Sequence, residues 1–296
     1  MINGDHNLSW RERLLYFPQC IKQWNVTTKG NLTTHFVNLK PTNEEMGSPS
    51  RRLCNMFWHT LNWARIAEQL GGQVKVFDVA CGAGQYGKKY QAYLGQSFSS
   101  YTGIDVYKHD QFPAEFTHIL DKAENIQHHI NDHNLIVSQS GLEHIEGDVD
   151  VLVHALTEQK AHCNKFLQIH LVPAPSSLFL YLWHGWRQYS KKNLDSISER
   201  MIELGGVSTL AIPLGGWRSF WVHFVEITVP TLARALFRKP QTASWDVIGS
   251  SVAAKNASAA LNDRFSKDQM PAFWAFIIYS DEIEVERLFN IIPLGK

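Results

Sequence analysis

The stretch DVACGAGQYG, residues 78–87, joins a strand-like segment to a helix-like segment. The preceding residues, QVKVFDVA (73–80), are rich in β-branched and other hydrophobic side chains, and the following ones, QYGKKYQAYL (85–94), read as a helix. Gly82, Gly84 and Gly87 have the GxGxxG spacing. Because glycine permits positive φ and a close backbone approach, and helix N-terminal amides favour polar groups, the stretch predicts a nucleotide-binding turn.

Acidic residues near this turn indicate which nucleotide it holds. Spacing alone allows NAD, since Asp105 lies eighteen residues after Gly87. Asp78, however, stands four residues before Gly82 at the end of the strand. A carboxylate there suits a positively charged ligand and suits a pyrophosphate poorly. S-adenosylmethionine carries an ammonium and a sulfonium and no phosphate, so the pattern favours it over NAD.

Three segments in this order carry a family resemblance: VFDVACGAGQYG (76–87), YTGIDVY (101–107) and NLIVSQSGLEHI (134–145). They resemble the Rossmann-like (class I) S-adenosylmethionine-dependent methyltransferases, over about residues 74 to 145 and less specifically at 271–279. The run HLVP…HGWRQY, within residues 170–189, also resembles methyltransferases found with bacterial surface-polysaccharide enzymes. The resemblance implies a methyltransferase that uses S-adenosylmethionine.

The order of the expected elements defines the fold class. Strands are expected at 73–80, 99–107, 116–120, 134–140, 165–175, 207–214 and 271–279, with helices at about 48–70, 85–94, 185–206 and 219–237 and a turn plus helix at 141–158. This order predicts an α/β fold, a Rossmann-like mostly parallel sheet with helices on both faces. Residues 1–47 are expected to form an N-terminal cap. Residues 48–296 would form the Rossmann-like domain, with an acceptor-site insertion at about 166–190.

The resemblance also implies roles for single residues at the cofactor site. Asp78 would organise the turn near the methionine end, Gly82 and Gly84 would pass beneath the cofactor, and Gly87 would pack the helix. Asp105 would accept hydrogen bonds from both ribose hydroxyls, as a carboxylate can. The full implied set of cofactor-binding residues is Asp78, Ala80, Cys81, Gly82, Gly84, Asp105, Val106, Lys122, Ala123, Ser138 and Gln139.

The segment at 169–190 follows a strand at the carboxyl edge of the sheet, where open α/β folds place ligands. A hydroxyl acceptor has to lose its proton, and histidine is a suitable base near neutral pH. His170 and His184 are the leading predicted bases, and His144 is a third. The predicted acceptor contacts are Arg187, Tyr189 and Trp183. A packing role is the alternative for each of these residues.

Composition indicates which partners and which cellular location to expect. The 28 basic residues balance the 28 acidic ones, so no overall charge attracts nucleic acid or an anionic membrane. Pro173 and Pro175 interrupt the longest uncharged stretch, so no membrane span is expected. The four scattered cysteines favour free thiols in a reducing compartment, and the cytoplasm is the expected location.

These observations predict O-methylation of a small molecule or carbohydrate: a sugar, a sugar nucleotide or a glycan. One alternative is a phenolic or quinone-like metabolite, and another is a non-catalytic methyltransferase-like binding module. LEH (142–144) resembles the acidic and histidine pair with which some quinone O-methyltransferases hold a divalent ion. Ser140 stands at the first acidic position of that pattern, so no metal site is predicted.

Overall fold

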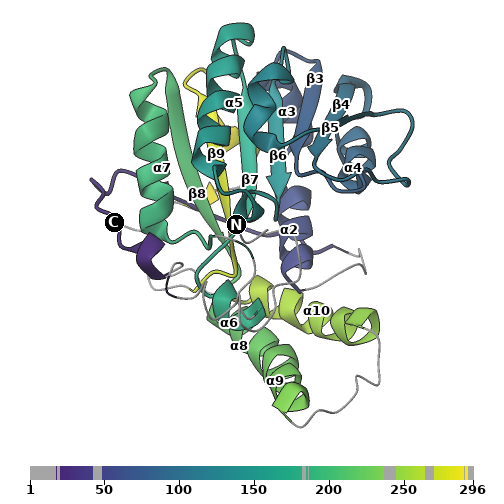
Figure 1. Ribbon diagram of the computed structural model, residues 1–296, viewed down its shortest axis with the longest axis vertical. Helices are drawn as coiled ribbons and strands as arrows, with labels where there is room; N and C mark the ends of the chain where they lie inside the picture. The colour runs from purple at the N-terminus through teal and green to yellow at the C-terminus, as the bar shows by residue number, and fades with distance from the viewer. Residues whose placement is uncertain are drawn as a thin grey trace.

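An eight-stranded sheet with helices on both faces forms the centre of the computed structural model (Figure 1). The structure describes residues 18, 21–42, 49–181, 185, 187–236, 245–263, 270–289 and 291–292. The strands of the sheet are β1 (Thr33–Thr34), β3 (Val74–Val79), β4 (Phe98–Asp105), β5 (Thr117–Leu120), β6 (Leu135–Gln139), β7 (Leu167–Pro173), β8 (Val207–Leu214) and β9 (Phe273–Ser280). Two further strands, β2 (Phe36–Val37) and β10 (Ile291–Ile292), form a separate antiparallel pair.

The strand order is β1-β8-β9-β7-β6-β3-β4-β5, which confirms the predicted Rossmann-like fold class. Strands β3 to β7 are parallel, whereas β9 runs antiparallel to both β7 and β8. From β3 the chain proceeds to β4 and β5 on one side and then returns to β6 and β7 on the other. The strand order therefore reverses between β3 and β6, and such a switch point is where open α/β sheets bind ligands.

Most of the longer helices match the expected segments, although α6 and α10 match none and the helices expected at 48–70 and 219–237 are divided. The principal helices are α2 (Pro49–Thr60), α3 (Trp63–Gln69), α4 (Gln85–Leu94), α5 (Asp148–His162), α6 (Ser177–Tyr181), α7 (Lys191–Glu203), α8 (Trp217–His223), α9 (Val229–Leu236) and α10 (Trp245–Leu261). Short turns are η1 (Gly95–Ser97), η2 (Ala123–His128), η3 (Leu142–His144), the π-helical η4 (Phe224–Thr228) and η5 (Val285–Leu288). The single helix expected at 48–70 is two, because Asn62 caps a new helix by accepting from the Arg65 amide. The aromatic helix expected at 219–237 is divided among α8, η4 and α9.

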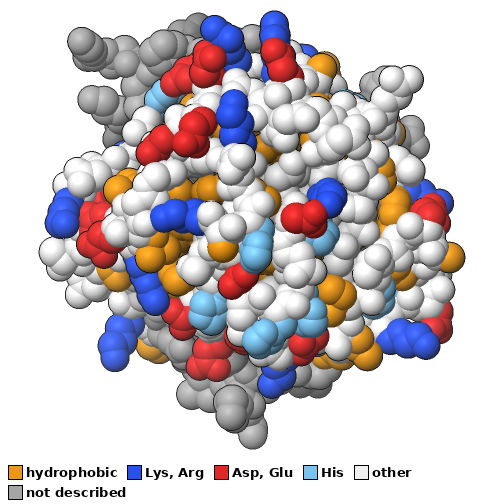
Figure 2. Space-filling view, turned by 90° about the horizontal axis from the view of Figure 1, so that it is seen from above, with side chains coloured by type: hydrophobic (Ala, Val, Ile, Leu, Met, Phe, Trp, Pro, Cys, Tyr) orange, Lys and Arg blue, Asp and Glu red, His pale blue; other side chains and the backbone are white. Residues whose placement is uncertain are grey.

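Alternating residues of the central strands face two hydrophobic layers. On one face, side chains of α2, α3 and α4 pack against strand residues such as Val76, Val137 and Ile169. On the other, α5 and α7 pack against the intervening residues, such as Phe77 and Ile136. This two-sided burial is what a largely parallel sheet requires. On the surface, basic and acidic side chains intermingle over the face seen from above (Figure 2).

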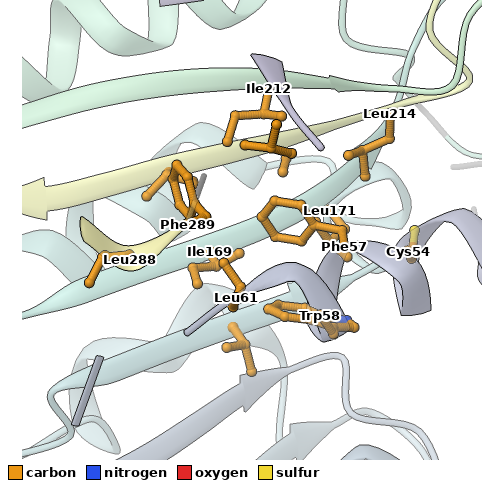
Figure 3. Packing of buried hydrophobic residues seen from close by; sticks show 14 of the residues in the cluster. Cys54, Phe57, Trp58, Leu61, Ile169, Leu171, Ile212, Leu214, Leu288 and Phe289 are labelled. Carbon is orange, nitrogen blue, oxygen red and sulfur yellow. The ribbon is translucent and has the colours of Figure 1, made fainter. Parts of the chain in front are cut away.

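Helix α2 crosses the sheet near the carboxyl ends of the parallel strands. Its side chains Phe57 and Trp58, and Leu61 directly after the helix, are buried, and they pack beside β7 and β8 and beside Leu288 and Phe289 (Figure 3). Burial of one such aromatic side chain contributes roughly 1.5–3 kcal/mol. The packing fixes the inner face of α2 above the switch point.

Helices α6, α8, α9 and α10 lie beyond the end of the sheet toward which β6 points (Figure 1). Helices α8 to α10 come between β8 and β9 in the chain, and α10 packs against α8 and α2. The sequence pattern predicts the helix at 219–237 in this part of the chain but does not predict α10. Within the described part of the chain, no helix is both long enough and apolar enough to cross a membrane.

About half of the expected N-terminal cap, residues 1–47, falls outside the described residues. Its described part adds the edge strand β1 to the main sheet, in parallel with β8. The backbone amides of Gly30 and Leu32 donate to the Asp195 carboxylate of α7, at 2.8 and 2.6 Å. This part of the segment is therefore an edge of the sheet, and a cap role remains a prediction.

Candidate active site

The glycine turn lies at the carboxyl end of β3, beside the switch point. Ala80, Gly82 and Gly84 have φ angles of 57°, 54° and 68°, in the left-handed region. A Cβ placed on Gly82 would meet no atom within 4 Å, so this side of the turn is open. A Cβ on Gly84 would lie 2.6 Å from the Phe112 ring, and one on Gly87 would lie 2.6 Å from the Phe116 ring. Gly87 thus sits where a helix-packing residue is expected, and Gly84 also accommodates an aromatic neighbour.

Asp105 ties the turn to the end of β4. Its Oδ2 accepts the Gly82 amide at 2.8 Å, and its Oδ1 accepts the Tyr107 amide at 3.0 Å. A carboxylate has about four lone-pair sites, so both oxygens keep capacity for ligand hydroxyls. This geometry suits the predicted contact with ribose hydroxyls.

Asp78 lies beneath the turn and is buried. The Tyr101 hydroxyl donates to its Oδ2 at 2.7 Å. Burial raises the pKa of Asp78 to about 7; the Tyr101 hydrogen bond opposes this shift and the negative charge of Asp105 adds to it. A cationic ligand bound here would favour the ionised carboxylate.

The loop after β6 lies directly against the glycine turn. A Cβ placed on Gly141 would lie 2.6 Å from the Ala80 Cβ and 3.2 Å from the Val79 carbonyl oxygen. Ser140 has φ of 52°, so each loop holds a non-glycine residue in the left-handed region, Ala80 in one and Ser140 in the other. Such conformations cost roughly 1–3 kcal/mol each and cluster at functional sites.

Gly141→Ala should lower the free energy of unfolding by about 1–3 kcal/mol, because the new methyl group forces the two loops apart. Gly147→Ala is the matched control, since its Cβ would meet only the Glu124 Cγ, at 3.5 Å. Urea denaturation of both variants measures the difference. Equal stability of the two would show that the loops are not in tight contact.

Four polar side chains bridge α2, α4 and the end of β6. Trp58 Nε1 donates to Gln139 Oε1 at 2.7 Å, and Gln139 Nε2 donates to the Tyr86 hydroxyl at 2.6 Å. That hydroxyl donates to Asn55 Oδ1 at 2.7 Å. Gln139 was predicted at the site, but Asn55, Trp58 and Tyr86 were not. The sequence signal that could have revealed this network is Asn55, a polar residue among the hydrophobic residues on the buried face of α2.

The predicted base His170 does not fit that role. It is 1% exposed, and its Nδ1 lies 2.9 Å from the Ser138 hydroxyl while its Nε2 lies 3.1 Å from Gln168 Oε1. Gln168 donates onward to Gln159 of α5, at 2.8 Å. Burial lowers the pKa of His170 to about 3. His170 and Ser138 therefore belong to a buried polar chain, in which both ring nitrogens of His170 are already engaged.

Two of the predicted acceptor contacts are also occupied inside the protein. Arg187 Nε lies 2.9 Å from Asp148 Oδ2, and the Tyr189 hydroxyl donates to the same oxygen at 2.6 Å. Tyr189 is 1% exposed. This cluster fixes residues 187–190 to the start of α5, a structural role. Trp183 and His184 lie outside the described residues.

The remaining predicted site residues lie around the turn and along the carboxyl ends of β4 to β6. Cys81 and Ala123 are buried, whereas Val106 and Lys122 are exposed. His144 is half-buried in η3. Among the described residues, no group of three or more His, Cys, Asp or Glu side chains is arranged to hold a metal ion.

Glu143 also lies at this edge of the sheet, and it is not among the predicted site residues. It lies in η3, is 1% exposed, and its Oε2 has no hydrogen-bond partner among the described residues. Burial raises its pKa to about 7, against the opposing effect of His144. Its only sequence signal is its place in LEH, immediately after the loop that contacts the glycine turn.

No model of a known protein family matches the chain, and no curated protein matches it. Solved structures that are similar include the plantazolicin methyltransferase BamL, in complex with a triazolic desmethylPZN analog and SAH. It has 15% identity and a TM-score of 0.46, covering 79% of this chain and 90% of that chain. A SAM dependent methyltransferase from Archaeoglobus fulgidus has 16% identity and a TM-score of 0.48, covering 79% and 95%. A putative sarcosine dimethylglycine methyltransferase from Galdieria sulphuraria has 11% identity and a TM-score of 0.44, covering 78% and 84%. At such low identities and TM-scores, these likenesses carry neither an activity nor a ligand to this chain.

Proposed function

We propose that the protein is an S-adenosylmethionine-dependent methyltransferase. One observation carries this proposal: an open glycine turn at the switch point is flanked by two carboxylates, Asp78 beneath it and Asp105 beside it. Neither is paired with a lysine or arginine among the described residues. The Asp78 carboxylate disfavours a pyrophosphate and favours a ligand with positive charge, and the Asp105 carboxylate can accept ribose hydroxyls.

The proposed contacts of the protein with the cofactor follow from this arrangement. Asp105 accepts the ribose hydroxyls, the open side of Gly82 leaves room for the ligand, and Asp78 provides negative charge near the methionine end. S-adenosylmethionine supplies the electrophilic methyl group when bound. The protein would then accelerate transfer mainly by holding the acceptor in line with that methyl group.

For the acceptor, we propose a hydroxyl of a sugar, sugar nucleotide or glycan. The balance of charge and the resemblance of residues 170–189 to surface-polysaccharide methyltransferases support this class. Of the three predicted acceptor contacts, Trp183 remains a proposal, whereas Arg187 and Tyr189 are engaged with Asp148.

The test measures S-adenosylhomocysteine formed from S-adenosylmethionine in the presence of uridine diphosphate glucose, a disaccharide or catechol. The expected result is methylation of a carbohydrate hydroxyl, unchanged by a chelator. Methylation of catechol that requires added Mg²⁺ would favour the phenolic or quinone-like alternative. Cofactor binding without turnover of any acceptor would favour the binding-module alternative.

A further inference from the structure

Glu143 is a buried carboxyl group with one oxygen that has no hydrogen-bond partner in the described part of the chain. Its side chain is 1% exposed, and Oε2 makes no hydrogen bond to any described residue. A buried polar atom left unsatisfied is destabilising, and an ionised one more so. Native proteins retain few such groups, and each calls for an explanation. A bound ligand that donates a proton to Oε2 would explain why this oxygen has no partner in the described part of the chain.

The surroundings of Glu143 place it at the edge of the sheet that holds the glycine turn. Gly141, two residues before it, packs against Ala80 of the turn. A Cβ on Gly185 would lie 2.8 Å from the Glu143 carbonyl oxygen and 2.9 Å from its Cγ, so the Gly185 backbone covers it. Its charge also acts on Cys54 of α2 and on Tyr189. Glu143 therefore lies among the turn, α2 and the segment expected to bind the acceptor.

We propose that Glu143 is the base that accepts the acceptor's proton. This inference rests on the proposed methyltransferase function and extends it to the acceptor. The acceptor is a nucleophile that carries a proton, such as a hydroxyl group. Its O–H bond breaks as the proton passes to Glu143 Oε2, and its oxygen forms a bond to the methyl carbon. The carbon–sulfur bond breaks with its electron pair going to sulfur, which leaves S-adenosylhomocysteine.

The local environment suits Glu143 to this role better than it suits His170. Both ring nitrogens of His170 are engaged by Ser138 and Gln168, whereas one Glu143 oxygen is not. A base works best when its pKa lies near the working pH. Burial moves the pKa of Glu143 to about 7 and that of His170 to about 3.

Sinefungin provides a test that needs no knowledge of the acceptor. In this analogue a carbon bearing a primary amine replaces the methylsulfonium group, so the amine occupies the position from which the methyl group is transferred. A carboxylate facing that position should pair with the ammonium. Isothermal titration compares sinefungin with S-adenosylhomocysteine, which lacks the amine, on the wild type, Glu143→Gln and the matched control Glu146→Gln. Glu146 is exposed and lies three residues further along the chain.

Glu143→Gln should weaken sinefungin binding about tenfold while S-adenosylhomocysteine stays within twofold, and Glu146→Gln should change neither. Equal changes for both ligands, or none, would overturn the assignment while leaving the methyltransferase proposal intact. A wild type that binds neither ligand would overturn both. Glu143→Asp guards against a folding defect, because it keeps the charge and withdraws it by one methylene. It should weaken sinefungin selectively by about threefold, and unaltered binding would contradict the assignment.

Discussion

Asp105→Asn should weaken S-adenosylmethionine binding by about 100-fold. The Asp105 carboxylate accepts the Gly82 and Tyr107 amides and is proposed to accept two ribose hydroxyls. Asparagine has a single acceptor oxygen, so its NH₂ group would face either a backbone N–H or the ribose. Hydrogen bonds to a charged group contribute roughly 1.5–3 kcal/mol each, and the loss of about 3 kcal/mol corresponds to two decades of affinity.

Isothermal titration at fixed salt measures this effect. Asp110→Asn is the matched control, since Asp110 is exposed and lies five residues further along the same loop. It should bind S-adenosylmethionine like the wild type. A loss of less than threefold in a folded Asp105→Asn protein would exclude Asp105 as a cofactor ligand.

Glu143→Gln should stabilise the protein by roughly 3 kcal/mol above pH 7, while impairing methyl transfer. The pKa of Glu143 is raised to about 7 by burial, against an ordinary value of 4.5. Between these values the native state holds a proton that the unfolded chain has lost, so stability falls as the pH rises. Glutamine does not ionise, so the Glu143→Gln protein does not lose this part of its stability as the pH rises. The gain should be small near pH 4.5 and complete above pH 7.

Urea denaturation of the wild type and Glu143→Gln at pH 5 and pH 8 tests the sign. Asp78 also has a pKa raised to about 7 by burial, but both proteins share its contribution, so the difference between them isolates Glu143. His144 from the same turn, Cys54 from α2 and Tyr189 are the described titratable groups that interact with it. A Glu143→Gln protein less stable than the wild type at pH 8 would contradict this account.

The local part of the candidate site is the part whose structure follows most directly from the sequence. The strand β3, the glycine turn and α4 are contiguous, so hydrophobic pattern and glycine spacing together define them. Asp105 is likewise found by its place at the end of the next strand. These residues meet because parallel strands end at the same edge of the sheet.

The histidines show why the acceptor side is harder to predict. All seven residues of β7 are buried, so the sequence around His170 carries no alternation that reveals which face it occupies. Its position at the end of a strand is compatible with a site, yet its side chain joins Ser138 and Gln168 in the interior. The burial of Tyr189 against Asp148, forty-one residues away in the chain, is similarly invisible to local patterns.

Long-range contacts account for the other residues that sequence misses. Trp58 meets Gln139 across eighty-one positions of the chain. Helix α10, with its mixture of alanine, serine and glycine, lacks a clear apolar stripe in the sequence. Glu143 becomes noticeable only when its burial and its unpartnered oxygen are known.

The central claim is that the turn at 78–87 binds S-adenosylmethionine, and isothermal titration with S-adenosylmethionine and with NAD tests it most directly. Asp78 and Asp105 should permit binding of S-adenosylmethionine and of S-adenosylhomocysteine, and Asp78 should disfavour the pyrophosphate of NAD. Binding of NAD without binding of S-adenosylmethionine would contradict the account.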